Sequence, residues 1–369
     1  MAENAAPASS RRPAIRKRVF EGDAARRGTA HGRAHAQEIR RYTDERVRLV
    51  ADGSWLGEAM DREAVLGLAE SMVPAHRAYA PDLCEEMEAM AAGSGLTPAE
   101  AVIVGGFTDF VDVVRGRVGS APEEDDCTAV LVPHALADGR GFLAQTWDMH
   151  DSATQYVVML EILPERGPRA LCFSTVGCLG QIGMNEAGIA IGINNLAAAV
   201  GRIGVTWPFV IRKVLQQTNL EDALACLTDV ELAGAHNYQL LDREGRGYNV
   251  EAMPDCLKVD ALDGAPLVHT NHCLHDETRR SEAPRASVLL ESSHARLQRA
   301  EELLAGSTSI SPEQLMELTR DPEAICQRAR PPFHIESSGA VVMRPASGDL
   351  WAVWGLPSEN EYVHFEIGG

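Results

Sequence analysis

The sequence predicts an α+β protein whose strands form a largely antiparallel sheet. Residues 22–115 carry apolar residues mostly at helical spacing, whereas short runs rich in Val, Leu, Ile and aromatic residues follow from residue 127. Strands in hairpin runs, with helices in blocks between them, favour antiparallel pairing over βαβ units. The chain has no internal repeat and no long linker, so we expect one domain over 21–369.

The N-terminal half reads as helical. Thr97-Pro98-Ala99-Glu100 is a good helix start, with a hydroxyl cap, a proline in the first turn and a glutamate placed for a capping box. A loop containing Gly and Pro follows at 115–126 and ends in four carboxylates. The expected helices here are 36–50, 62–79, 82–92 and 101–114.

The C-terminal half reads as strands joined by tight turns, with three helical stretches. The turns 185–188 and 242–245 have the Gly, Asn and Asp content of hairpins. The expected strands are 128–133, 141–147, 156–163, 169–175, 180–184, 188–193, 238–241, 248–251, 340–344, 350–355 and 362–367. The expected helices are 207–227, 285–304 and 312–319.

Composition excludes several classes of function. A formal net charge of −19 argues against binding to nucleic acid or to anionic membranes, because both require a positive face. No apolar run is long enough to span a membrane. Eight scattered cysteines form no disulfide framework and suit a reducing compartment. Residues 1–20 lack the hydrophobic segment of a signal peptide, so we expect a disordered lead and a cytoplasmic protein.

Cys127 is the most informative residue, since it begins a β-prone run directly after the acidic loop. A chain cut between Asp126 and Cys127 would give a cysteine with both a nucleophilic sulfur and a free α-amine. An α-amine has a pKa of about 7.7–8.0, so it can act as a general base near neutral pH without a histidine. The alternative is a buried cysteine that packs as a small hydrophobe.

Two further segments carry candidate groups. Asp148 ends the strand expected to pair with that of Cys127, so a hairpin would bring it back beside Cys127; the alternative is a strand-end turn residue. Asn194 and Asn195 end another strand, where backbone N–H groups can bind a developing oxyanion; the alternative is a plain turn.

Residues 268–275 contain three His and one Cys, a composition that could indicate zinc. The spacing argues against this interpretation, because His272 and Cys273 are adjacent and point to opposite faces of an extended segment. Asn271, within the same segment, offers a neutral side-chain donor suited to an oxyanion hole.

Together these segments resemble the acyl-coenzyme A:6-aminopenicillanic acid acyltransferase family of N-terminal-nucleophile proteins, from about residue 20 to the C-terminus. Five motifs in order carry the resemblance. They are Gly28-Thr29-Ala30-His31-Gly32, Asp126-Cys127-Thr128, Gln145-Thr146-Trp147-Asp148, the stretch 177–188 and His269-Thr270-Asn271-His272-Cys273.

The resemblance implies a four-layer αββα fold and an inactive precursor that cleaves itself before Cys127. The products would be an α chain (1–126) and a β chain (127–369) that stay associated. It further implies that Cys127 is the nucleophile and that Asp148 orients it. Asn271 and the backbone N–H of Asn195 would be the oxyanion donors. No cofactor or metal is implied, although acyl-coenzyme A could be the acyl donor.

The chain departs from the family's best-known members at four positions. Asp126 replaces a glycine, Ala129 a β-branched hydroxyl residue, and Thr146 an asparagine. The family's late Ser-Arg-Gly motif is Ser337-Ser338-Gly339 here, so the arginine that would contact a substrate carboxylate is missing. The changes at Ala129 and Ser338 alter the pocket and argue against penicillin precursors as substrates.

Three hypotheses follow, in this order. The first is a self-processing amide hydrolase or acyltransferase that acts on a small N-acyl compound or thioester through a Cys127 acyl-enzyme. The second is an uncleaved cysteine hydrolase that pairs Cys127 with His150 or His269. The third is a non-catalytic protein that binds a metal through residues 269–275.

Overall fold

The computed structural model describes residues 14–54, 58–118, 126–331 and 334–367. Two sheets form its centre. The larger has the order β1-β4-β5-β6-β7-β8-β9-β10 and the smaller β11-β2-β3-β12-β13-β14. Among the described strands every neighbouring pair is antiparallel except β1 with β4. The predicted α+β class with largely antiparallel sheets is confirmed.

The elements have the following bounds. The larger sheet contains β1 (Lys17–Gly22), β4 (Val157–Pro164), β5 (Ala170–Thr175), β6 (Ile182–Asn185), β7 (Ile189–Leu196), β8 (Ala235–Asp242), β9 (Gly247–Ala252) and β10 (Leu257–Ala261). The smaller contains β11 (Leu267–His269), β2 (Asp126–Val132), β3 (Phe142–His150), β12 (Ile335–Arg344), β13 (Asp349–Trp354) and β14 (Val363–Glu366). The helices are α1 (Ala24–Ala34), α2 (Ala36–Ala51), α3 (Arg62–Glu70), α4 (Val73–Tyr79), α5 (Pro81–Ser94), α6 (Pro98–Gly105), α7 (Phe107–Val118), α8 (Trp207–Val214), α9 (Leu220–Thr228), α10 (Asp276–Arg279), α11 (Ser287–Leu304) and α12 (Pro312–Thr319).

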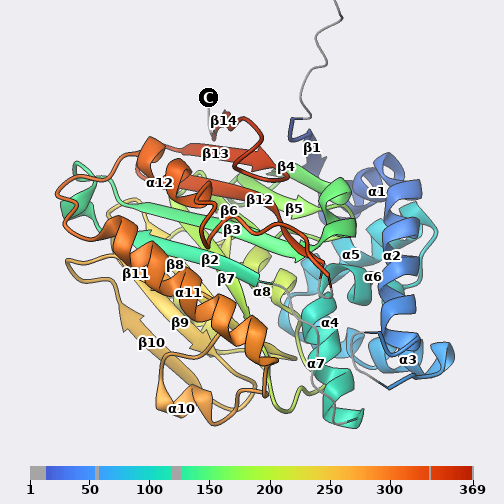
Figure 1. Ribbon diagram of the computed structural model, residues 1–369. Coiled ribbons are helices and arrows are strands. Elements are labelled where there is room, and N and C mark those ends of the chain that lie inside the picture. Colours follow the sequence, from blue (N-terminus) through green and yellow to red (C-terminus); the bar gives the residue numbers. More distant parts are fainter. Residues whose placement is uncertain (1–13, 55–57, 119–125, 332–333, 368–369) are drawn as a thin grey trace, which may run out of the picture.

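The layers stack as helix, sheet, sheet, helix. Strands β2 and β3 contact β7 and β8, so the two sheets face each other. Helices α11 and α12 cover the outer face of the smaller sheet, while α8 and α9 contact the larger one (Figure 1). Because both faces of the central strands are covered, β2, β5, β7 and β8 are buried along their whole length. The predicted four-layer αββα fold is confirmed.

Several helix boundaries have local causes. The Thr97 hydroxyl and the Glu100 carboxylate form the predicted capping box at the start of α6. The helix expected over 101–114 is instead two, α6 and α7, divided at Gly106. A Cβ at Gly106 would lie 2.5 Å from Cβ of Thr206, so only glycine permits this close approach. The helices expected over 62–79 and 207–227 are also divided, into α3 and α4 and into α8 and α9.

The predicted disordered segment, residues 1–20, extends too far toward the C-terminus. Residues 1–13 lie outside the described part, but Lys17–Gly22 form strand β1, which pairs in parallel with β4. The pairing of Phe20 with Ile162 buries an apolar side chain at the edge of the larger sheet. The first three residues of β1 are exposed, and Phe20 is the large apolar side chain that the strand buries. Strands β10 and β11 were also not predicted.

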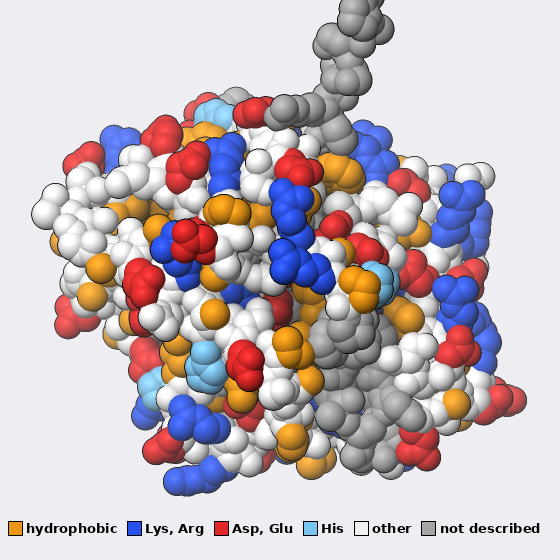
Figure 2. Space-filling model, viewed as in Figure 1, with side chains coloured by type: hydrophobic (Ala, Val, Ile, Leu, Met, Phe, Trp, Pro, Cys, Tyr) orange, Lys and Arg blue, Asp and Glu red, His pale blue; other side chains and the backbone are white. Residues whose placement is uncertain are grey.

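Figure 2 shows one face of the surface. Acidic and basic side chains alternate across that face, with apolar side chains between them. In the described part of the chain, no helix is long and apolar enough to cross a membrane.

Candidate active site

Cys127 is the second residue of β2 and is 2% exposed. Successive side chains of a strand point to opposite faces. Val130 and Val132 pack with the α11 and α12 layer, while Cys127 and Leu131 belong to the core that includes the larger sheet. The Cys127 thiol therefore faces the space between the sheets, and the Asp126 carboxylate faces α11.

Asn271 lies directly against the predicted cleavage junction. Its Oδ1 accepts a hydrogen bond from the backbone N–H of Cys127 at 2.7 Å, and its Nδ2 donates to the Asn195 carbonyl at 3.0 Å. Arg296 Nη2 also donates to Oδ1, at 3.0 Å. Two donors on one atom and a carbonyl on the other fix which atom of the amide is oxygen. The structure thus brings together Cys127, Asn271 and Asn195.

Arg296 is the main site residue that sequence reasoning missed. Its side chain is fully buried on α11 and donates to the Cys127 carbonyl and to Thr128 Oγ1. It also forms an ion pair with the Asp126 carboxylate at 3.0 Å. Arg296 therefore contacts both residues of the junction. The sequence feature that could have identified it is its spacing. Arg296 falls on the same face of the helix as the buried residues Leu289, Ser293 and Ala300.

Asp148 lies where the predicted hairpin puts it. In the β2–β3 register it is paired with Asp126, and Cys127 is paired with Trp147. Directly paired side chains share a face, so the Asp148 carboxylate lies on the α11 side beside that of Asp126. Ser337 Oγ donates to Asp148 Oδ1 at 2.6 Å, and Thr146 Oγ1 donates to Oδ2 at 3.3 Å.

The environment of Asp148 shifts its titration strongly. Burial, with a smaller contribution from the charge of Asp126, raises the pKa of this carboxyl to about 7, against the opposing effects of Arg296 and the Ser337 hydrogen bond. A carboxyl with a pKa near 7 can exchange a proton at neutral pH. Thr146, one of the departures from the family pattern, keeps a polar role here because its hydroxyl also accepts from the Thr128 N–H at 3.1 Å.

Asn195 occupies the end of β7 next to the junction. Its carbonyl points toward Asn271 Nδ2, away from the paired strand β8. In an antiparallel strand the N–H and C=O of one residue point to the same edge, so the Asn195 N–H points toward the site as well. Two residues earlier on β7, the Ile193 N–H donates to Gln145 Oε1 of β3 at 2.8 Å. This hydrogen bond connects the two sheets beside the site.

A small apolar cavity adjoins Cys127 and Asn195. Its walls include Trp147, Trp207 and Tyr42, and its volume is about 30 Å³. That volume holds about one or two water molecules and is well below the ~300–1,000 Å³ of small-molecule sites.

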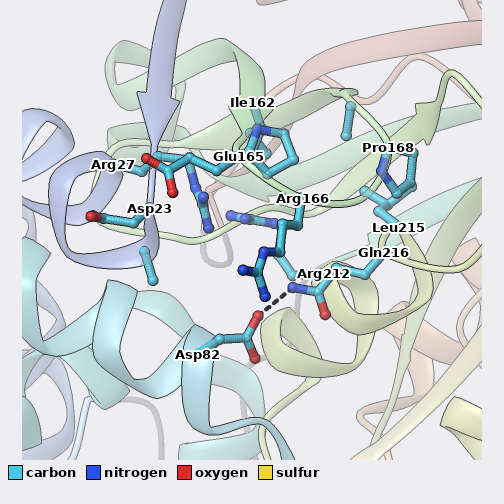
Figure 3. A pocket seen from close by; sticks show the side chains of 13 residues that line it. Asp23, Arg27, Asp82, Ile162, Glu165, Arg166, Pro168, Arg212, Leu215 and Gln216 are labelled. Carbon is cyan, nitrogen blue, oxygen red and sulfur yellow. Dashed lines mark hydrogen bonds between the residues drawn. The ribbon is translucent and has the colours of Figure 1, made fainter.

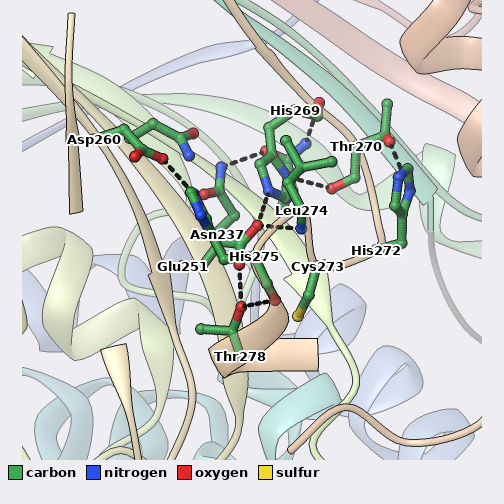
Figure 4. Close-up of polar contacts among 12 residues, drawn as sticks. Asn237, Glu251, Asp260, His269, Thr270, His272, Cys273, Leu274, His275 and Thr278 are labelled. Carbon is green, nitrogen blue, oxygen red and sulfur yellow. Dashed lines mark hydrogen bonds and ion pairs between the residues drawn. The ribbon is translucent and has the colours of Figure 1, made fainter. Parts of the chain in front are cut away.

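The histidines of the 269–275 segment have separate partners (Figure 4). His269 bonds Glu251 Oε1 through Nε2 at 3.0 Å and the Thr270 carbonyl through Nδ1 at 2.8 Å. His272 bonds Ser293, and His275 bonds Asp260. Within the described residues, no three side chains of His, Cys, Asp or Glu are placed to hold a metal ion.

Glu251 acts as an anchor for this segment. Besides His269, it accepts hydrogen bonds from the Leu274 N–H at 2.5 Å and from the Thr278 hydroxyl. Burial would raise the pKa of Glu251, but the hydrogen bond and charge of His269 and the other donors lower it to about 2. The ring nitrogens of His269 face Glu251 and the Thr270 carbonyl, so neither is directed at Cys127. The Glu251–His269 contact holds the end of β11, directly before the segment that carries Asn271.

The glycine motif near the N-terminus has a packing role. Gly28 and Gly32 lie four residues apart on α1, against α5. A Cβ at Gly28 would lie 2.1 Å from the Glu86 carbonyl oxygen, and one at Gly32 would lie 2.2 Å from that of Met90. His31, between them, accepts from the Gly177 N–H at 3.2 Å. Gly28 and Gly32 allow α1 to pack closely against α5, and His31 connects α1 to the segment after β5.

A second cavity, of about 190 Å³, is lined by the start of α1, the β4–β5 connection and α8 (Figure 3). Neither Asp126 nor Cys127 lines it. Two of its arginines, Arg27 and Arg212, already pair with the buried Glu86 carboxylate. Arg212 also donates to the Leu179 carbonyl at 2.8 Å. These contacts tie α1, α5 and α8 together, which makes the cluster part of the scaffold.

Comparison with known proteins bears on this site. The family profile described as acyl-coenzyme A:6-aminopenicillanic acid acyl-transferase matches residues 136–355, more than half of the chain. The chain belongs to this family. The matched part contains Asp148, Asn195, Asn271 and Arg296, and Cys127 precedes it. Membership in the acyl-transferase family places the chain among enzymes that transfer or hydrolyse acyl groups.

One curated relative from this family is the 40 kDa form of acyl-coenzyme A:6-aminopenicillanic-acid acyltransferase from Emericella nidulans. It is 25% identical over 285 residues, which cover 76% of this chain and 74% of the relative. Among solved structures, a mutant of conjugated bile acid hydrolase from Clostridium perfringens has a TM-score of 0.45 and 12% identity, over 65% of this chain and 97% of the other. Penicillin V acylase from Agrobacterium tumefaciens has a TM-score of 0.40 and 14% identity, over 65% and 86%.

Proposed function

We propose that this protein is a self-processing cysteine hydrolase or acyltransferase that acts on the acyl group of a small amide or thioester. The observation that carries the proposal is the hydrogen bond from the Cys127 N–H to Asn271 Oδ1. It holds the nitrogen that would become the α-amine, next to a thiol in the same residue. Membership in an acyl-transferase family supports the same chemistry.

In the uncut chain, the Cys127 thiol would attack the carbonyl carbon of Asp126. The C–N bond then breaks, the acyl group moves to sulfur as a thioester, and the Cys127 nitrogen takes up a proton to become an amine. Water hydrolyses the thioester and leaves a carboxylate at Asp126 and a free thiol. Arg296, which binds both the Cys127 carbonyl and the Asp126 carboxylate, positions the junction for this step.

In the processed protein, the α-amine would accept the thiol proton while sulfur attacks the substrate carbonyl. An amide nitrogen carries two hydrogens, and the bond from Asn271 Nδ2 to the Asn195 carbonyl uses one. The second hydrogen and the Asn195 N–H are then the two donors for the oxyanion. Asp148, on β3 beside Asp126, faces α11 from the smaller sheet and would orient the amine.

The thioester gives a direct test of the self-cleavage step. Freshly purified protein is incubated with hydroxylamine, a nucleophile that attacks thioesters faster than water does. We expect faster cleavage and an α chain that ends in a hydroxamate at Asp126, and no cleavage in Cys127→Ala. Cleavage at the same rate in Cys127→Ala would contradict the proposed role of the thiol.

A further inference from the structure

The cavity beside Cys127 contains two polar side chains whose oxygen atoms lack hydrogen-bond partners. Gln181 and Asn195 both line this cavity, and they are 4% and 7% exposed. Within the described part of the chain, Gln181 Oε1 and Asn195 Oδ1 are buried atoms that make no hydrogen bond. Leaving a buried polar atom unpaired is unfavourable, and most such atoms in folded proteins are paired. The two amides therefore indicate a bound polar ligand.

Three further polar side chains on the cavity wall contact one another. Thr108 Oγ1 accepts a hydrogen bond from Trp207 Nε1 at 3.2 Å and lies 3.3 Å from His236 Nε2. The other ring nitrogen of His236 lies 3.2 Å from an Asp109 carboxylate oxygen. The polar atoms of these side chains are thus engaged within the protein, in contrast to the two amide oxygens.

The cavity has the size of a water site. Its volume is about 30 Å³, above the roughly 10–15 Å³ that one ordered water needs. Buried waters make about three hydrogen bonds, typically to polar atoms that would otherwise be unpaired. Gln181 Oε1 and Asn195 Oδ1 can each accept a hydrogen from such a water. Water is therefore a ligand whose size and hydrogen bonding both fit this cavity.

The cavity also adjoins the atom on which a thioester would form. Cys127 lines it, and the thiol faces the space between the two sheets. Self-cleavage would transfer the Asp126 carbonyl carbon to the Cys127 sulfur, so the carbon to be hydrolysed would lie at the cavity wall. Because Cys127 is only 2% exposed, a water held at this wall is better placed for the attack than bulk water is.

We propose that Gln181 and Asn195 bind the water that hydrolyses the Cys127 thioester. Hydrolysis is then the built-in fate of the acyl group, and transfer to an amine has to compete with it. This inference rests on the proposed function and names the acyl acceptor of that same site.

The step balances as an ordinary thioester hydrolysis. The water oxygen bonds to the thioester carbonyl carbon, the C–S bond breaks, and a carboxylic acid forms. One hydrogen of the water passes through the Cys127 α-amine to the sulfur, which becomes a thiol again. Gln181 and Asn195 exchange no proton in this step; their oxygens accept hydrogen bonds from the water and so orient it.

Competition between water and hydroxylamine during self-cleavage measures this step alone. Precursor that is still uncut at purification is incubated at one hydroxylamine concentration, and intact mass gives the ratio of hydroxamate to carboxylate at Asp126 of the α chain. This ratio compares two nucleophiles on the same thioester, whatever the rate of the step before it. Gln181→Met keeps the side-chain length and removes the acceptor. We expect the ratio to rise about 10-fold, because attack by water slows whereas hydroxylamine in excess does not need the site.

Gln239→Met is the matched control. Gln239 is also fully buried, on β8, and its amide bonds Asn249 and the Leu267 carbonyl instead. We expect the wild-type ratio in this variant. A rise as large as that in Gln181→Met would overturn the water site, because general loosening of the core would then explain both.

The outcomes separate the two proposals. Wild-type protein that stays uncut overturns the proposed function. A wild-type ratio in Gln181→Met overturns the water site and leaves the self-processing enzyme intact. Should Gln181→Met fail to fold or to cleave, Asn195→Ala tests the same site, because it removes Oδ1 and keeps the backbone N–H. The same rise is expected there, and an unchanged ratio overturns the water site.

Discussion

The backbone nitrogen of Cys127 and the side-chain oxygen of Asn271 lie 2.7 Å apart, although 144 residues separate them in sequence. Ser293 holds the other side of Asn271, since its hydroxyl accepts from the Asn271 N–H at 2.9 Å. The junction is thus assembled by β2, by the segment after β11 and by α11. A loss at any of these contacts should slow self-cleavage.

Replacing Asn271 with Ala tests this relationship. The variant loses the acceptor for the Cys127 nitrogen and a candidate oxyanion donor, so we expect self-cleavage to slow by about 10²–10³-fold. The rate is measured from the appearance of the two fragments on gels. Asn237→Ala is a control, because that buried asparagine bonds Asn194 at 3.2 Å instead of Cys127. Equal rates for Asn271→Ala and wild type would rule out the role of Asn271.

Asp148 should give a pH-dependent stability. The raised pKa, about 7, means that the unfolded chain loses this proton at lower pH than the folded chain does. The contribution of Asp148 to the free energy of unfolding is therefore full below about pH 4 and is lost as pH rises through 7.

The measurement compares Cys127→Ala with Cys127→Ala/Asp148→Asn, both uncut, by urea unfolding from pH 4 to 8. The difference in their free energies of unfolding should shrink as pH rises. A difference that grows with pH would contradict the raised pKa.

The buried Glu251–His269 pair should matter for stability and for cleavage. Removing one partner of a buried ion pair typically costs about 3–5 kcal/mol. We expect Glu251→Gln in the uncut Cys127→Ala background to lose stability on this scale in urea unfolding. The double change to Leu at 251 and 269 should regain part of it, because no buried imidazole is then left without its carboxylate partner. Full stability in Glu251→Gln would show that the pair does not anchor the segment.

Gly28 should be intolerant of even a methyl group. A Cβ there would lie 2.1 Å from the Glu86 carbonyl oxygen, and overpacking of this kind costs about 1–3 kcal/mol or more. Gly67 is the matched helical control, since a Cβ there meets nothing within 4 Å. Gly67→Ala should gain up to about 1 kcal/mol from helix propensity. Thermal unfolding of both variants checks the contrast, and equal shifts would contradict the packing argument.

Much of the site could be predicted from the sequence, because short turn and strand patterns place Asp148 and Cys127. The turn after Pro133 and the β-prone runs on either side were enough to bring Asp148 beside Cys127. Asn271 could be singled out as a neutral donor in a segment with chemistry-bearing residues. The helix breaks at Gly106 and after Glu70 were missed, since tertiary contacts, such as that of Gly106 with Thr206, decide them.

The partners of these residues could not be predicted in the same way. Ser292 and Arg296, on α11, and Arg285, just before it, reach Asp126 because α11 covers β2, and that packing joins segments more than 150 residues apart. Ser337 reaches Asp148 through the pairing of β12 with β3. Such contacts depend on sheet order, which spacing along the chain does not determine.

Intact mass of the purified wild-type protein tests the central claim most directly. The account predicts two associated polypeptides whose masses correspond to 1–126 and 127–369, and one uncut polypeptide for Cys127→Ala. A single wild-type polypeptide that spans Asp126 and Cys127 and is fully active on an amide or thioester would contradict it.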